Sequence, residues 1–169
     1  MMRAAIYKIA AVALSAAFLC SAASCHHLDD DRIPVLPVNI VFPTIAQWNV
    51  YGAAGAMDYN RFILEQRIPS NFPYTAFSAT GFGGVLLVGD VLGEPKAYDL
   101  SCPVEAKRDV RIEIDRETMY ARCPKCGSEY DVFSLMGHPV SGPAAEKGYG
   151  LRRYYVGPGR DGSYRQIGY

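Results

Sequence analysis

Three cysteines stand in two short segments whose composition is suited to holding a metal ion. Cys102 precedes a proline, and Cys123 and Cys126 belong to a Cys-Pro-Lys-Cys-Gly segment. Thiolates are preferred ligands of zinc, and two cysteines separated by two residues look like half of a zinc knuckle. In an oxidising compartment, nearby thiols usually form a disulfide instead, which would leave one of these three thiols free.

The residues around these cysteines resemble the Rieske family of iron–sulfur proteins. That family has a Cys-x-His loop, a Cys-x-x-His-Gly-Ser loop and a Gly-Pro-Ala turn, and each loop gives one Cys and one His to a [2Fe–2S] cluster. Cys102 and Cys123 match the family cysteines. Ser128 and Tyr130 match positions whose hydrogen bonds raise the potential of the cluster, and Gly142-Pro143-Ala144 matches the turn that covers it. The resemblance implies a cluster held between two loops.

The chain departs from the family pattern at both ligand histidines. Val104 stands where the first histidine belongs, and Cys126 stands where the second belongs. One iron could take Cys102 and Cys123, whereas the other would have only Cys126, with Glu105 or water in the remaining position. A third thiolate adds negative charge in place of a neutral imidazole and lowers the reduction potential. The resemblance therefore implies a [2Fe–2S] cluster with altered ligation.

Two other states of the site stay open. Three thiolates together with Glu105 or His138 could hold Zn²⁺. Alternatively, no metal is bound and two of the cysteines form a disulfide. We expect His138 to be exposed and not to bind a metal, because the matching position of the Rieske family lies in the covering loop and is not a ligand.

Short apolar runs separated by turn signals predict the elements that position these loops. Residues 85–88 are expected to form a fully buried strand, and residues 110–114 alternate apolar and charged side chains as in a strand with one solvent-facing side. Further strands are expected over residues 38–42, 96–100, 119–122, 130–133, 151–156 and 164–167. This pattern predicts an all-β fold, a Rieske-like antiparallel β-sandwich or small barrels with a two-loop metal-site subdomain.

Three other segments have a less regular pattern. Residues 48–56 are interpreted as a strand and turn, with Trp48 in the core, and residues 59–66 as a short helix or an irregular segment. Gly81-Phe82-Gly83-Gly84 precedes a strand, and no helix follows it. A phosphate-binding loop needs a helix start after the glycines, so we interpret this run as close backbone packing or a bulge.

The N-terminus has the pattern of an exported lipoprotein. Arg3 and Lys8 precede an apolar stretch that ends in Ala22-Ala23-Ser24-Cys25. A positive start, an apolar stretch and small residues before a cysteine resemble a secretory signal with a lipobox. We therefore expect residues 1–24 to be a lipoprotein signal peptide and Cys25 to be lipidated.

The rest of the chain is expected to comprise a lipidated flexible tether over residues 25–37 and one Rieske-like β domain over residues 38–169. The tether contains Asp29-Asp30-Asp31, which resembles the acidic tract of some surface-exposed lipoproteins of Gram-negative bacteria. A solvated spacer would have the same composition. The expected location is the outer membrane, on its periplasmic or outer side, with the lipid anchor as the membrane contact.

The composition and motifs also narrow the class of function. Lys plus Arg and Asp plus Glu number 17 each, so the net charge is zero and no basic field attracts nucleic acid. No nucleophile triad, carboxylate pair or phosphate loop is evident, so catalysis by this chain alone is not expected. The first hypothesis is an electron-transfer lipoprotein with an unknown redox or envelope partner. The alternative is a cluster-free binding or structural lipoprotein, stabilised by a disulfide or zinc.

Replacing the predicted lipidation residue tests the anchor. In a Cys25→Ala variant the protein should move from the membrane fraction to the soluble fraction, because the acyl chains provide the attachment. The measurement is fractionation combined with incorporation of labelled fatty acid. A membrane-bound variant, together with a wild type that takes up no label, would show that the lipoprotein prediction is wrong.

Overall fold

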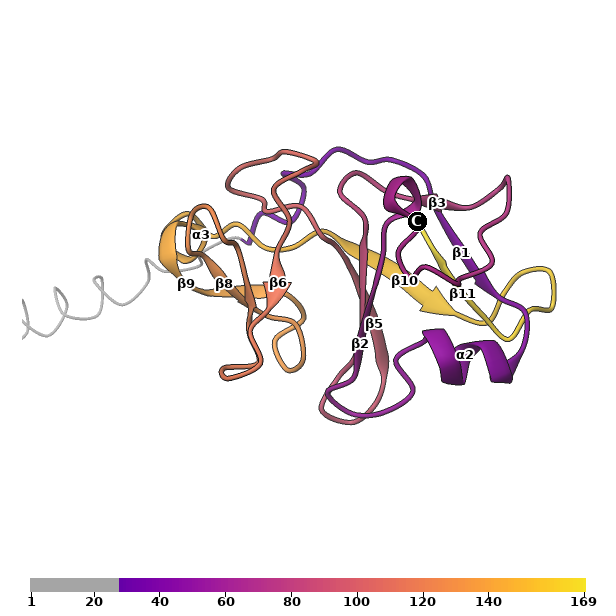
Figure 1. Ribbon diagram of the computed structural model, residues 1–169. Helices are drawn as coiled ribbons and strands as arrows, with labels where there is room; N and C mark the ends of the chain where they lie inside the picture. Colours follow the sequence, from indigo (N-terminus) through magenta and orange to yellow (C-terminus); the bar gives the residue numbers. More distant parts are fainter. Residues whose placement is uncertain (1–27) are drawn as a thin grey trace, which may run out of the picture.

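The computed structural model describes residues 28–169, which form two antiparallel β-sheets with little helix. The larger sheet has seven strands in the order β2-β4-β5-β10-β11-β1-β3, and the smaller has four in the order β6-β7-β8-β9. The larger sheet curls into a nearly closed barrel, and the smaller sheet lies beside one end of it (Figure 1). The predicted all-β class is confirmed.

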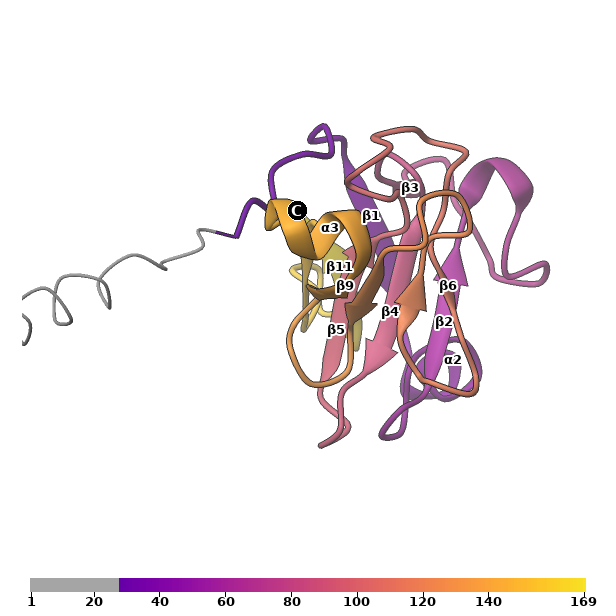
Figure 2. The same cartoon turned by 90° about the vertical axis from the view of Figure 1, so that its left-hand side faces the viewer.

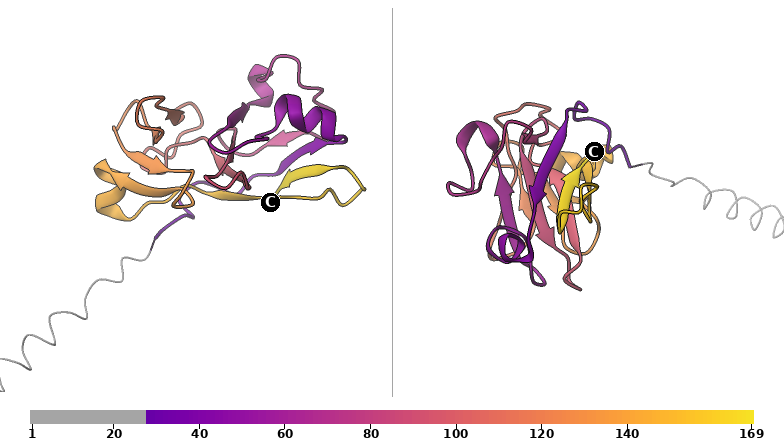
Figure 3. Two further views of the ribbon diagram at one scale, coloured as in Figure 1. Left: turned by 90° about the horizontal axis from the view of Figure 1, so that it is seen from below. Right: turned by 90° about the vertical axis from the view of Figure 1, so that its right-hand side faces the viewer.

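The strands of the larger sheet are β1 Val38–Phe42, β2 Tyr59–Phe62, β3 Ala79–Thr80, β4 Val85–Gly89, β5 Pro95–Asp99, β10 Arg153–Gly157 and β11 Arg165–Gly168. Those of the smaller sheet are β6 Glu113–Ile114, β7 Ala121–Arg122, β8 Glu129–Asp131 and β9 His138–Ser141. The helices are α2 Ile45–Tyr51, α3 Gly142–Lys147 and the 3-10 turn η2 Leu64–Gln66. Helix α3 and β9 stand in front of the barrel strands in Figure 2, and β10 leads the chain back into the barrel in Figure 3.

Strand β4 contributes to two hydrophobic cores at once. It pairs with β2 on one side and β5 on the other, and all of its residues are buried. Because side chains alternate between the two faces of a strand, Leu86 and Val88 pack in the core that surrounds the cysteines. Val85 and Leu87 pack in a second, aromatic core inside the barrel, among Phe42, Trp48, Phe62 and Phe72. The predicted fully buried strand is therefore confirmed.

The strand predicted at the beginning of residues 48–56 is wrong, because helix α2 extends to Tyr51 and includes Trp48. The Thr44 hydroxyl caps this helix by accepting the N–H of Gln47 at 3.3 Å. A threonine cap satisfies an amide that otherwise has no partner in the first turn, and so favours helix over the strand that aromatic residues suggest. Trp48 is 6% exposed, which confirms its predicted core position.

Residues 59–66 also differ from the short helix or irregular segment predicted for them. They form β2, which pairs along β4 from Tyr59↔Val88 to Phe62↔Val85, followed by η2. A partner strand more than twenty residues away decides this conformation, so the local pattern could not reveal it.

The strand expected over residues 110–114 is interrupted. Only Glu113–Ile114 belong to β6, while Arg111 forms an isolated bridge with Ser101. The predicted inward position of Ile112 is nevertheless correct, because that side chain is fully buried. The period of two therefore identified the buried face but not the length of the strand.

The described part of the predicted flexible tether is packed against the domain. Arg152 donates through Nε to the carbonyl of Ile33 at 2.7 Å and pairs with Asp31 at 2.9 Å. Asp30 pairs with Arg153 at 2.9 Å, and Ile33 is 1% exposed. The predicted tether therefore contacts the domain over Asp30 to Ile33, where its acidic residues have arginine partners on β10 and on the residue before it. Its flexibility stays a prediction.

The predicted signal peptide, residues 1–24, and the lipidation residue Cys25 lie outside the described residues. Over residues 28–169, no helix combines the length and the apolar character that crossing a membrane requires.

The fastening of the N-terminal segment can be measured by unfolding. Arg152 is almost completely buried and has partners in both terminal segments, so Arg152→Ala should lower the free energy of unfolding by about 2–4 kcal/mol. Arg153→Ala is the matched control, since its ion pair is half-exposed and should cost less than about 1 kcal/mol. Urea unfolding followed by the fluorescence of the single tryptophan measures both. Equal effects of the two variants would contradict this role of Arg152.

Candidate metal centre

Two loops bring three thiols together at one end of the barrel. Cys102 comes from the loop after β5, Cys123 directly follows β7, and Cys126 lies in the turn between β7 and β8. Their sulfur atoms all lie within 4.8 Å of one another, and the Sγ atoms of Cys102 and Cys126 are 3.5 Å apart. The three predicted site residues are therefore neighbours in space, and all three are free thiols in the structure.

Each loop is closed by backbone hydrogen bonds on its own cysteine. In the first loop, the N–H of Cys102 donates to the carbonyl of Val110 at 3.0 Å, and the Cys102 carbonyl accepts from Ala106 at 2.8 Å. In the second loop, the Cys123 carbonyl accepts the N–H of Gly127 at 3.0 Å. Gly127 has a φ of 73°, which glycine adopts without strain. Both cysteines are thus held by main-chain geometry.

A buried carboxylate at the end of β5 fixes the start of the first loop. Asp99 is fully buried and accepts the backbone N–H groups of Phe82 at 3.0 Å, Gly83 at 3.1 Å and Ser101 at 2.7 Å. The hydroxyl of Tyr154 donates to it at 2.6 Å. A buried carboxylate is stable only when its oxygens are satisfied in this way. Asp99 therefore ties the cysteine loop to two other segments of the barrel.

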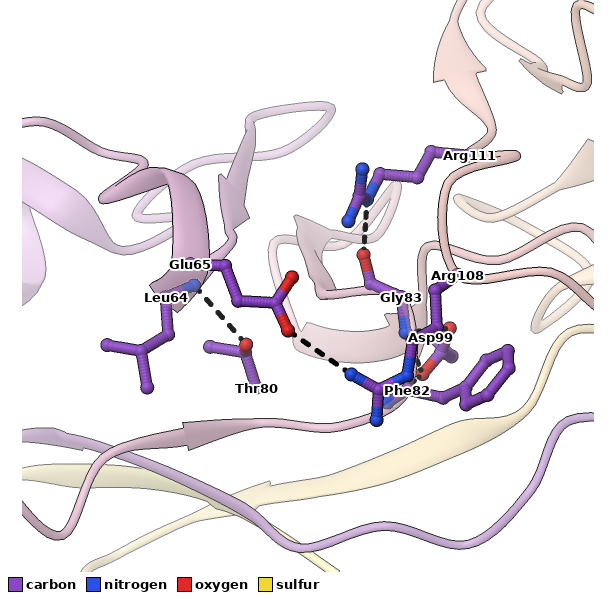
Figure 4. Close-up of polar contacts among 8 residues, drawn as sticks. All are labelled: Leu64, Glu65, Thr80, Phe82, Gly83, Asp99, Arg108 and Arg111. Carbon is purple, nitrogen blue, oxygen red and sulfur yellow. Dashed lines mark hydrogen bonds and ion pairs between the residues drawn. The ribbon is translucent and has the colours of Figure 1, made fainter.

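The glycine run 81–84 has a packing role, as its sequence position suggested. A Cβ atom on Gly83 would lie 1.9 Å from the hydroxyl of Ser101, so only glycine fits beside the residue that precedes Cys102. The Gly83 carbonyl also accepts a hydrogen bond from Arg111, as Figure 4 shows together with the Asp99 contacts. The interpretation of close backbone packing is confirmed.

The predicted tuning residues lie against the thiols. The Tyr130 hydroxyl is 3.6 Å from Cys102 Sγ, and the Ser128 hydroxyl is 3.1 Å from Cys126 Sγ. Both side chains are fully buried. Their effect on the potential of a cluster stays a prediction, but their position gives two of the sulfurs a polar neighbour inside an apolar core.

The Gly-Pro-Ala segment lies over the second loop as the first turn of helix α3, whereas a turn was predicted. Pro143 suits that place because its missing N–H would have no partner in the first turn of a helix. The N–H of Ala144 donates to the Ser128 hydroxyl at 3.0 Å. A Cβ atom on Gly142 would lie 3.0 Å from the Cα of Ser128, so glycine permits this close contact. The segment thus covers the cysteine loop.

The residues considered as a fourth ligand lie elsewhere. Glu105 forms an ion pair with Lys125 at 2.6 Å, and His138 is exposed at the start of β9, as expected. Val104 packs against the core around the cysteines. Among residues 28–169, no His, Asp or Glu joins the three cysteines in a group that could hold a metal ion. This described part of the chain therefore offers three donor atoms at the site.

Burial and hydrogen bonding give the thiols different acidities. Burial raises the pKa of Cys102 to about 12, although hydrogen bonds from the Glu105 backbone and from Tyr130 oppose this. Burial also raises the pKa of Cys126, but hydrogen bonds from Ser128 and from the other thiols outweigh it, so that this pKa lies below its usual value. The thiolate is the form that binds metal or attacks a disulfide. Of these two thiols, Cys126 therefore forms the thiolate more readily.

The spacing of the sulfurs fits one metal ion. A tetrahedral zinc ion binds sulfur at about 2.3 Å, which places its ligand sulfurs about 3.8 Å from one another. The observed separations of 3.5 Å and up to 4.8 Å bracket that value. Three cysteines close together can therefore hold a metal ion, with the fourth position left to water or another donor.

Comparison with known proteins does not assign the chain to a family. Models of known protein families give no match to the chain, and a search of curated proteins finds no relative.

Sequence reasoning missed two contributors to this site. Asp99 ends a strand directly before the first cysteine loop, and a carboxylate at that junction is the signal that could have drawn attention to it. Lys125 is the second contributor, and no sequence signal marks it, because its pairing with Glu105 depends on how the two loops meet.

Removal of the Ser128 hydroxyl should loosen the cover over the second loop. Ser128→Ala leaves the buried N–H of Ala144 without its acceptor, which should lower the free energy of unfolding by about 1–3 kcal/mol. Ser134→Ala, at an exposed position of the following loop, is the control and should change it by less than about 0.5 kcal/mol. The measurement is urea unfolding of both variants. A Ser128→Ala variant with the same free energy of unfolding as the wild type would contradict the role given to this hydroxyl.

Proposed function

We propose that this chain is a metal-binding lipoprotein of the cell envelope, in which three thiolates on a Rieske-like scaffold hold one thiophilic divalent ion such as Zn²⁺. The observation that carries the proposal is the compact triangle of sulfurs from Cys102, Cys123 and Cys126. The lipid on Cys25 anchors the domain at the outer membrane, on its periplasmic or outer side.

The triangle favours a single ion over two. In a two-iron cluster of the Rieske arrangement, Cys102 and Cys123 belong to one iron and Cys126 to the other, so the two sets are farther apart than ligands of one ion. Here Cys126 is only 3.5 Å from Cys102 across the loops. Cys126, which occupies the position of the second family histidine, thus lies as close to Cys102 as two ligands of one ion would.

The proposed role of the ion is structural. Zn²⁺ bound by three thiolates joins the two loops and contributes to the folding free energy. The chain prepares the site for it: Cys102 and Cys123 are fully buried, and Leu86, Ile112 and Leu151 exclude water from the same core. A domain held together in this way serves as a binding or structural module, the second of the classes expected from the sequence.

Electron transfer through a [2Fe–2S] cluster is the second candidate. It is favoured by the contact between the Tyr130 hydroxyl and Cys102 Sγ at 3.6 Å, since the Rieske resemblance assigns hydrogen bonds at this position to tuning of the cluster. With three thiolates the potential would lie below that of an ordinary Rieske centre. This candidate requires an iron–sulfide chromophore, which a zinc protein lacks.

Metal analysis of anaerobically purified protein separates the candidates. We expect about one zinc per chain and a colourless protein, because three thiolates form a zinc site. The Cys102→Ser, Cys123→Ser and Cys126→Ser variants should each lose most of the zinc, whereas Cys25→Ala, which removes the predicted lipidation residue, should retain it.

Two results would overturn the zinc proposal. Iron with acid-labile sulfide in a red-brown protein would establish the electron-transfer candidate in its place. A metal-free protein with a mass two hydrogens lower than the reduced chain would instead indicate a disulfide, for which the neighbouring thiols of Cys102 and Cys126 are the expected pair.

A further inference from the structure

The two cysteine loops are joined by one ion pair close to the thiols. Glu105 is the third residue after Cys102, and Lys125 directly precedes Cys126. Their charged atoms are 2.6 Å apart, with the Glu105 side chain 17% exposed and the Lys125 side chain 52% exposed. The carboxylate is therefore largely enclosed between the loops, while the ammonium group keeps contact with water.

Other polar contacts do little to hold one loop against the other. The backbone hydrogen bonds of residues 102–110 and of residues 123–128 stay within each loop. The polar contacts that cross between these two segments are those among the thiols themselves and the Glu105–Lys125 ion pair. Because free thiols are weak hydrogen-bonding groups, the ion pair is the stronger connection in the absence of metal.

The backbone beside Glu105 is strained. Ala106 has a φ of 48°, a left-handed conformation that an L-residue with a side chain adopts only at an energetic cost. The conformation turns the chain directly after Glu105, and the N–H of Ala106 returns to the carbonyl of Cys102. A strained turn persists when its surroundings hold it, and the ion pair of the neighbouring Glu105 with Lys125 is one such restraint.

We propose that Glu105 and Lys125 form a clasp that sets the spacing of the two cysteine loops, and that both are positioning residues of the thiol site. The inference rests on the proposed function for its metal-binding consequence. Cys126 is the least buried of the three thiols and is bonded to Lys125 in the chain. It is therefore the thiol whose distance from Cys102 depends most on the clasp.

Three possible roles of Glu105 and Lys125 predict different changes in metal affinity when these residues are replaced. If they act as a clasp, both Glu105→Gln and Lys125→Met weaken metal binding, and the exchanged pair Glu105→Lys with Lys125→Glu restores it. If Glu105 is instead a metal ligand, Lys125→Met frees it and does not weaken binding, and the exchanged pair stays weak. If Lys125 acts only by its charge, Glu105→Gln strengthens binding because it removes a negative charge near the thiolates.

The test measures Zn²⁺ affinity of the full chain by competition with a chromogenic chelator. Each single variant should bind Zn²⁺ about ten-fold more weakly, the lower end of the effect usual for residues that orient metal ligands. The exchanged pair should return to within about three-fold of the wild type. Glu65→Gln is the matched control, since it breaks the Arg108–Glu65 ion pair on the same loop, 3.2 Å long, which joins that loop to η2 (Figure 4). It should leave the affinity unchanged.

A metal-free measurement separates this inference from the proposed function. Diamide accepts two hydrogens from a pair of thiols and leaves a disulfide, so its rate of joining Cys102 to Cys126 reports how closely the loops approach. The single variants should react several-fold more slowly than the wild type, and the exchanged pair should recover the rate.

If the wild type binds no Zn²⁺ but the diamide rates follow this order, the proposed function fails and the clasp stands. If the single variants match the wild type in both affinity and diamide rate, or if the exchanged pair is not restored in either, the clasp is wrong.

Discussion

One buried carboxylate ties the first cysteine loop to two other segments of the barrel. Asp99 receives backbone N–H groups from the glycine turn before β4 and from Ser101, together with the hydroxyl of Tyr154 on β10. An ionised group in such a place is destabilising unless every oxygen is satisfied. Three segments of the barrel must therefore reach their final positions together, and the loop that carries Cys102 begins from that junction.

The two sheets are packed around two separate hydrophobic cores. The barrel has its own aromatic core. A second core lies between the barrel and the smaller sheet, and the barrel strand β4 contributes Leu86 and Val88 to it. The cysteine loops extend from this shared core, so their bases are rigid while Cys126 at the tip keeps partial exposure. Thiols arranged in this way can accept a metal ion or join one another, and the compartment and metal supply decide which reaction occurs.

Much of the fold could be predicted from local pattern, and the exceptions have identifiable causes. The buried run in β4 and the inward position of Ile112 followed from hydrophobicity and a period of two. Helix α2 was missed because one cap at Thr44 outweighed aromatic composition. Strand β2 was missed because its partner β4 is distant in sequence. The contacts of Asp30 and Asp31 could not be predicted because their arginine partners lie about 120 residues away.

The sequence by itself determined the all-β class and the three thiols in two segments that follow strands, because alternation and residue type are local properties of the chain. Tertiary structure alone decided how closely the thiols approach one another, that Asp99 finds four donors and that Glu105 meets Lys125 instead of the thiols. Each of these contacts joins residues brought together by strand pairing and loop geometry. Their distances depend on the packing of the whole domain, and no window of sequence contains that information.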